Sequence, residues 1–69
     1  MTNSELLKAA INECGLKLRY IATRLNISYQ AFLNKMNNSS EFKASEITIL
    51  CELLKLDNRQ KEDIFFSKM

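Results

Sequence analysis

The near absence of turn-forming residues is the feature that most limits how this chain can fold. Its 69 residues include one glycine, Gly15, and no proline. Tight β-hairpin turns need backbone conformations that glycine adopts most readily, so an all-β fold would lack the residues that close its hairpins. The sequence therefore predicts an all-α fold.

The length of the chain restricts it to one domain, 1–69, because so short a chain has too little apolar surface for two separate cores. Hydrophobic residues make up 46% of it and charged residues 26%, which is typical of a folded domain rather than a disordered segment. No apolar run approaches the roughly 20 residues that cross a bilayer, and the first residues do not resemble a signal peptide. We therefore expect a soluble, cytoplasmic protein.

Apolar residues recur at three- and four-residue spacing in separate segments, which polar capping residues or Gly15 divide. Between two of these segments, Asn26 tolerates the left-handed conformation of a helix end, Ile27 is an apolar plug, and Ser28 is a good N-cap. Glu46 lies where a carboxylate can accept hydrogen bonds from the unpaired amides of a first turn. The predicted helices cover five ranges: 4–14, 18–25, 29–36, 45–55 and 58–66.

Metal, haem and Cys/His chemistry have no supporting motif in this sequence. It contains no histidine, and its two cysteines, Cys14 and Cys51, are far apart and form no CxxC pair. Both cysteines fall on apolar helix faces, so we expect them to be reduced and buried. The residue spacing indicates no catalytic site, no cofactor, no metal and no small-molecule ligand.

Positive charge is concentrated in the middle of the chain. Residues 16–43 carry five cations against the single acid Glu41, a local excess of +4, whereas the whole chain has a net charge of +2. Scattered surface charge usually only keeps helices soluble, but a basic block of this kind also fits binding to DNA. The five cations are Lys17, Arg19, Arg24, Lys35 and Lys43.

The second and third predicted helices, with the short turn between them, have the organisation of a helix-turn-helix. This arrangement needs a small residue in the first helix, an apolar plug in the turn and an apolar anchor in the second helix. Ala22, Ile27 and Phe32 supply these three residues in register.

Residues 21–32 resemble the helix-turn-helix of the Cro and CI type (XRE-like) phage repressors, whose usual pattern is Leu/Ile-Ala-x-x-Leu/Val-Gly-Val/Ile-Ser. The resemblance extends from about Leu6 to Phe66 and is greatest for small prophage-encoded regulators of Cro size. Two positions depart from the pattern, since Asn26 and Asn38 stand where the family often has glycine. The resemblance implies a compact five-helix, lambda-repressor-like DNA-binding domain.

By this resemblance, the helix at 29–36 enters the major groove of an operator in double-stranded DNA. Side-chain amides such as those of Gln30 and Asn34 suit adenine, and Leu33 either contacts a thymine methyl group or packs against the protein. The base contacts predicted in this way are Tyr29, Gln30, Leu33 and Asn34. The predicted phosphate contacts are Lys17, Arg19, Ser28, Lys35, Asn38, Ser39 and Lys43.

The apolar ending Ile64-Phe65-Phe66 contains more bulk than one short helix can bury in its own domain. We expect these three residues to form the interface of a homodimer, either in solution or only on DNA. Such a dimer would place two reading helices on half-sites about one helical turn apart.

The sequence therefore predicts a DNA-binding transcriptional regulator, not an enzyme, that acts by occupying an operator. A protein-interaction module remains the alternative: an antitoxin-like or antirepressor-like chain that keeps the helical fold and binds another protein through the helix at 29–36 or through Phe65 and Phe66. An enzyme is a third possibility, but a fold of this size has no room for a deep pocket.

Overall fold

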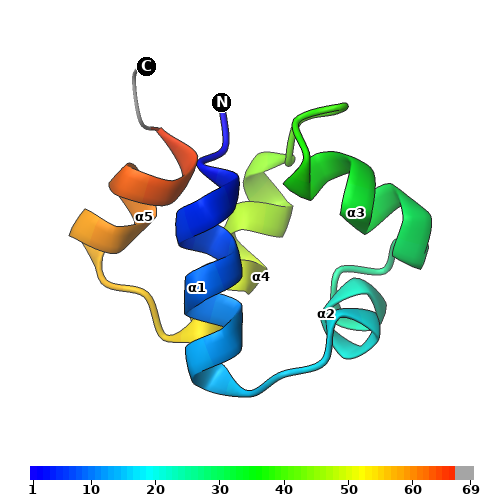
Figure 1. The fold of residues 1–69 in the computed structure, drawn as a ribbon, viewed down its shortest axis with the longest axis horizontal. Helices are drawn as coiled ribbons and strands as arrows, with labels where there is room; N and C mark the ends of the chain where they lie inside the picture. The colour runs from blue at the N-terminus through cyan, green and yellow to red at the C-terminus, as the bar shows by residue number, and fades with distance from the viewer. Residues whose placement is uncertain (67–69) are drawn as a thin grey trace.

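The structure of the protein is a computed structural model that describes residues 1–66. Within that range it contains five α-helices and no strand, so the all-α prediction is confirmed (Figure 1). Every predicted helix boundary lies within one residue of the observed one. The helices are α1 (Ser4–Cys14), α2 (Leu18–Arg24), α3 (Tyr29–Met36), α4 (Ala44–Leu54) and α5 (Asn58–Phe65).

Side chains at the starts of four of the helices satisfy amides that have no partner within the helix. At α4 the carboxylate of Glu46 performs this role, because its Oε1 accepts from the amide of Lys43 at 2.8 Å. The capping role predicted for Glu46 is therefore confirmed. At α1, α3 and α5 the caps are Asn3 on the amide of Leu6 (3.1 Å), Ser28 on Ala31 (3.0 Å) and Asp57 on Gln60 (2.8 Å), whereas no side chain caps α2.

Asparagine occupies two positions with a left-handed backbone conformation, at which the repressor pattern often has glycine. The φ angle is 60° at Asn26 and 64° at Asn38, and asparagine is among the non-glycine residues that adopt this conformation most readily. Both departures from the repressor pattern are therefore compatible with the turns that glycine would make. Gly15, with φ of 70°, ends α1 in the same way.

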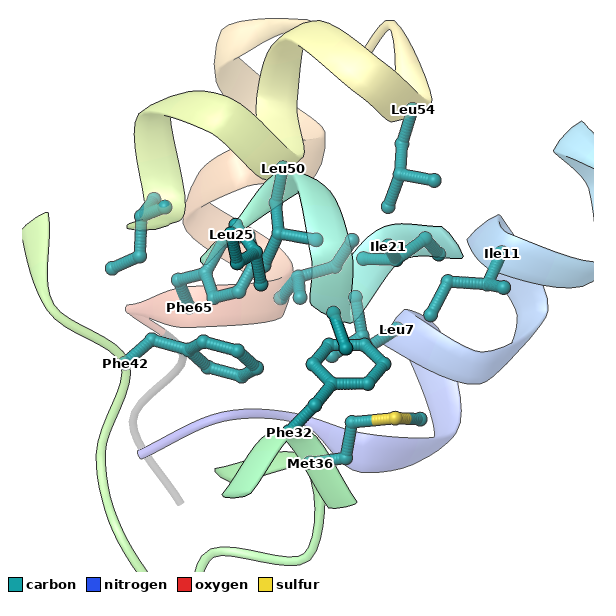
Figure 2. Packing of buried hydrophobic residues seen from close by; sticks show 13 residues of the cluster. Leu7, Ile11, Ile21, Leu25, Phe32, Met36, Phe42, Leu50, Leu54 and Phe65 are labelled. Carbon is teal, nitrogen blue, oxygen red and sulfur yellow. The ribbon is translucent and has the colours of Figure 1, made fainter. Parts of the chain in front are cut away.

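The core gathers buried side chains from all five helices and from the loop before α4 (Figure 2). Phe32 on α3 has no exposed surface. Phe42 lies in the loop and makes edge-to-face contacts with Phe32 and with Phe65 on α5, at ring-centroid distances of 6.1 and 5.7 Å. The aromatic contacts therefore tie α3, the loop and α5 into one core.

The prediction that Ile64, Phe65 and Phe66 form a dimer interface is wrong for two of the three residues. Ile64 and Phe65 are only 3% and 4% exposed, because both side chains pack into the protein's own core. They are not available to a second copy. Phe66, at 56% exposed, is the member of this set that remains on the surface.

The cysteines also differ in part from the prediction. Both are free thiols, as expected, but Cys14 is exposed and Cys51 is half-buried. Cys14 falls at the last residue of α1, where its Sγ donates to the carbonyl of Leu54 at 3.4 Å. Burial raises the pKa of the Cys51 thiol. In the described part of the chain, no helix is both long enough and apolar enough to span a membrane.

Ala22 is a small buried residue of α2, close to the turn that leads to α3. Ala22 is 2% exposed, and its carbonyl accepts a hydrogen bond from the amide of Ile27 in the turn at 3.1 Å. The turn therefore folds back on α2 and directs α3 across it (Figure 1). Because Ala22 is buried in the core, a larger side chain at position 22 would have to displace its neighbours.

We expect Ala22→Leu to destabilise the protein by about 1–3 kcal/mol, because overpacking forces side chains out of their preferred rotamers or shifts the backbone. Urea unfolding followed by circular dichroism measures the change. Ala9→Leu, at an exposed position of α1, is the matched control and should leave stability nearly unchanged. Equal stability of the two variants would show that position 22 does not set the approach of α2 to α3.

Candidate nucleic-acid interface

Helix α3 has one buried and one exposed face. Phe32 and Met36 are buried in the core, whereas Gln30 and Asn34 are exposed. The two exposed residues are four apart and therefore neighbours on the helix surface. The amide Nε2 of Gln30 donates to Oδ1 of Asn34 at 3.0 Å, so the two predicted base-contacting residues form one hydrogen-bonded pair.

The hydrogen bond leaves much of each amide free. Gln30 keeps its carbonyl oxygen and its second N–H, while Asn34 keeps its whole NH2 group. A carbonyl acceptor beside an N–H donor is the set that matches N6 and N7 of adenine. The pair can therefore present a preformed donor and acceptor pattern, because the bond to Asn34 restricts the rotamers of Gln30.

Tyr29, at the first position of α3, contacts a residue of α2. The guanidinium carbon of Arg19 lies 4.2 Å from the centre of the Tyr29 ring, within the range of a cation–π interaction. Tyr29 is half-buried and Arg19 is exposed. Two residues predicted to contact DNA are thus brought together across the two helices.

Leu33 is half-buried and packs against the core. This placement fits the packing role that was one of its two predicted roles. It also lines an open groove of about 380 Å³ between α1 and α3. The other lining residues are Lys8, Ile11, Asn12, Leu16, Leu18, Met36 and Asn37.

Lys35 was predicted to contact phosphate, and this prediction is wrong. Its side chain is buried, and its Nζ donates to both carboxylate oxygens of Glu46, at 2.6 and 2.8 Å. An ammonium group committed to a carboxylate in this way is not free to meet a DNA phosphate. Helical spacing offered the signal, since Lys35 follows Phe32 by three residues and so shares its buried side of α3.

Several interactions act on the ionisation of Glu46. Burial by itself raises the pKa of a carboxyl group. The hydrogen bonds from Lys35 and from the Lys43 amide, with the charges of both lysines, outweigh burial and hold the pKa of Glu46 below its usual value. The ion pair is therefore formed at neutral pH and joins α3 to the start of α4.

Asn38, a second predicted phosphate contact, has its side chain engaged elsewhere. Its Oδ1 accepts from the amide of Thr2 at 3.0 Å, and its Nδ2 donates to the carbonyl of Thr2 at 2.9 Å and to the hydroxyl of Ser4 at 3.5 Å. Both N–H groups of the amide are thus in use. The structure assigns Asn38 to holding the N-terminal segment, and the phosphate prediction is wrong for its side chain.

The remaining predicted phosphate contacts are on the surface. Ser28 is exposed at the start of α3, and Ser39 is exposed in the loop that follows it. With Lys35 paired, four cations of the basic block stay exposed, and Glu41 is the one acid between residues 16 and 43. The four are Lys17, Arg19, Arg24 and Lys43.

Comparisons of the chain with protein-family models, with curated proteins and with solved structures find no match. Among residues 1–66, no group of three or more His, Cys, Asp or Glu side chains could hold a metal ion.

We expect Glu46→Gln to lower stability at neutral pH by about 1–3 kcal/mol, since it leaves the Lys35 ammonium buried without its carboxylate. Because folding lowers the pKa of Glu46, the contribution of the ion pair is fully present above the pKa that this carboxyl group has in the unfolded chain, and it is lost as the pH falls through the lower folded pKa. The difference in stability between the natural protein and the variant should therefore shrink in acid.

Urea unfolding at a series of pH values from 7 down to 3 measures this difference. Glu52→Gln, an exposed carboxylate on the same helix, is the control and should show a much smaller difference at pH 7. A gap between Glu46→Gln and the natural protein that stays constant over the whole series would contradict the role given to the ion pair.

Proposed function

We propose that this protein is a sequence-specific DNA-binding transcriptional regulator of the Cro and CI repressor type, with α2 and α3 acting as a helix-turn-helix. In this proposal α3 enters the major groove of an operator, and the protein acts in the cytoplasm by occupying DNA rather than by catalysis. The observation that carries the proposal is the hydrogen-bonded amide pair of Gln30 and Asn34 on the exposed face of α3.

The packing of α3 against the core supports a role for its exposed face in recognising base pairs. Sequence recognition needs side chains in fixed positions, because each base pair presents its donors and acceptors at defined points of the groove. Phe32 and Met36 anchor the opposite face in the core, and Lys35 is paired with Glu46. We propose that Gln30 binds adenine while Asn34 orients it and contacts the neighbouring base pair.

Exposed cations at two places support contacts to the DNA backbone. Lys17 directly precedes α2 and Lys43 directly precedes α4. In Figure 1 the segment before α2 and the loop after α3 lie toward opposite ends of the molecule. Phosphate contacts at both places would bracket α3 and fix its register on the duplex. Ser28 and Ser39, both exposed, can donate hydroxyl groups to the same backbone.

We further propose that two copies of the protein pair on the operator through the exposed Phe66. Phe66 is 56% exposed, and Met1, at 70% exposed, is also an exposed apolar residue. Two Cro-type subunits on half-sites about one helical turn apart convert two weak contacts into one specific complex. This proposal predicts a two-fold symmetric operator.

Selection of bound duplexes from a randomised library tests the function directly. Enrichment of a defined motif supports the proposal, and a symmetric motif reports the spacing of the two copies. The absence of both enrichment and salt-sensitive binding would contradict it and would favour the alternative, a helical module that binds another protein.

On the selected duplex, we expect Gln30→Ala and Asn34→Ala each to weaken binding by about 1–3 kcal/mol and to relax the preference at one base position. Titration of each variant against the preferred duplex and single-base variants of it measures both effects. Asn58→Ala, which removes an exposed amide from α5, is the matched control and should bind like the natural protein. Unchanged base preference in both α3 variants would exclude a reading role for this pair.

The salt dependence of DNA affinity distinguishes lysines that contact the DNA backbone from other surface lysines. We expect Lys17→Gln and Lys43→Gln each to reduce the slope of log affinity against log salt by about one, because each removes one phosphate contact. Lys55→Gln, at an exposed position between α4 and α5, should leave the slope unchanged. Titrations at four salt concentrations give the slopes, and equal slopes for all three variants would contradict the placement of the backbone contacts.

A further inference from the structure

We propose that Tyr29 does not contact DNA itself but serves as a platform that positions Arg19, and that Arg19 is the residue that binds the DNA. This inference rests on the proposed function and deepens it. It assigns the Arg19 guanidinium to a pair of closely spaced acceptor atoms, which the DNA offers either as two phosphate oxygens or as O6 and N7 of one guanine. A contact to guanine would make Arg19 a specificity residue alongside Gln30, whereas a contact to phosphate would make it a residue that sets the register on the duplex.

The first observation is the close cation–π contact between the two side chains. The Arg19 guanidinium carbon lies 4.2 Å from the centre of the Tyr29 ring. A cation–π contact holds the guanidinium against the ring without using an oxygen or nitrogen acceptor, so it commits none of the five N–H donors to an acceptor atom. Arg19 is therefore positioned while its N–H groups stay available.

The second observation is that the guanidinium N–H groups of Arg19 have no acceptor in the described part of the protein. Within residues 1–66, the side-chain N–H groups of Arg19 donate no hydrogen bond to the protein. The salt bridge in the same range joins Lys35 to Glu46 and does not involve Arg19. A guanidinium that is oriented by a ring and lacks an acceptor is prepared for an external ligand with paired acceptors.

Arg24 provides an internal comparison. It lies on the same helix, but its Nη1 donates to the Tyr20 hydroxyl at 2.9 Å, and its guanidinium carbon is 5.9 Å from the centre of that ring. Arg24 thus uses a donor on a residue of its own helix and is not closely stacked. Of the two arginines of α2, Arg19 is the one that contacts an aromatic ring closely while none of its side-chain N–H groups has a protein acceptor among the described residues.

The position of the pair connects it to the candidate reading residues. Tyr29 is the first residue of α3 and directly precedes Gln30, while Arg19 lies in the first turn of α2. The stack therefore brings a cation from α2 to the same end of α3 that carries Gln30. Ordering the long arginine side chain before binding also removes part of the entropy that is otherwise lost on the DNA.

The test is a double-mutant cycle on the selected duplex, with the full chain. We expect Arg19→Ala to weaken binding by about 5- to 100-fold, as loss of a paired guanidinium contact does. Tyr29→Leu fills the half-buried position without an aromatic ring and should weaken binding by about 2- to 5-fold, the range of an exposed cation–π interaction. Tyr29→Phe keeps the ring and should bind like the natural protein.

The decisive comparison is the effect of Tyr29→Leu in the Arg19→Ala background. If Tyr29 acts only through Arg19, the double variant should bind no more weakly than Arg19→Ala alone. A loss in Tyr29→Phe equal to that in Tyr29→Leu, or additive losses in the double variant, would overturn the inference and make Tyr29 a direct contact. Thermal melting of each variant ensures that only folded proteins are compared.

The same variants identify which acceptor Arg19 meets. If it meets guanine, Arg19→Ala should relax the preference at one base pair in a repeated selection. If it meets phosphate, the loss should be uniform across sequences and the salt slope should fall by about one. Either result supports the platform, provided that the double-mutant cycle shows coupling.

A measurement without DNA tests the contact between Arg19 and Tyr29 by itself, and DNA binding by the natural protein separates failure of the proposed function from failure of this inference. The side-chain protons of Arg19 should show a ring-current shift in the NMR spectrum of the free protein, retained in Tyr29→Phe and absent in Tyr29→Leu. If the natural protein binds no DNA, the proposed function and the inference both fall, even when this shift is present. If it binds DNA but the cycle shows no coupling, the inference alone is overturned.

Discussion

The burial of Phe32 is the interaction on which the candidate interface depends. Its ring has no exposed surface, and it meets Phe42, which in turn meets Phe65. A helix of eight residues has little stability by itself, so α3 exists because its inner face is part of this core. Once Phe32 is placed, helical geometry leaves Gln30 and Asn34 on the outer face, and the amide pair follows from their four-residue spacing.

The ion pair of Lys35 and Glu46 restricts how α3 can be placed against α4. Apolar contacts alone allow a short helix to rotate or slide by small amounts, whereas a charge pair with two hydrogen bonds is satisfied in one arrangement. Glu46 accepts from Lys35 and from the Lys43 amide together, so one carboxylate both starts α4 and sets where α3 sits against it. Such a pair is often a device for a specific arrangement more than for stability.

Sequence reasoning predicted the helices and turns well because the signals for them are local. Caps such as Ser28 and the left-handed Asn26 act within a few residues, and apolar spacing reports the inner face of each helix directly. The errors at the candidate site come from partners that are distant in sequence. Lys35 is paired with a residue 11 positions away, and Asn38 is bound to one 36 positions away.

The same limit explains the contact that sequence reasoning did not find. Arg19 and Tyr29 were each assigned to DNA separately, because nothing local indicates that a residue of α2 stacks on the first residue of α3. Charge counted along the chain also overstated the available surface cations, since it included Lys35. Helical spacing can indicate that Lys35 is buried and so exclude it from the predicted phosphate contacts, but only the packed structure identifies Glu46 as its partner.

The N-terminal residues have a mechanical consequence for the two ends of the molecule. The backbone of Thr2 is held by Asn38 after α3, the Ser4 hydroxyl donates to the carbonyl of Met36, and the amide of Asn3 donates to the carbonyl of Ile64 at 2.6 Å. This short strap joins the last turn of α3 to the last turn of α5. The N-terminal residues therefore restrain the spacing of α3 and α5 by hydrogen bonds, in addition to the apolar contacts of the core.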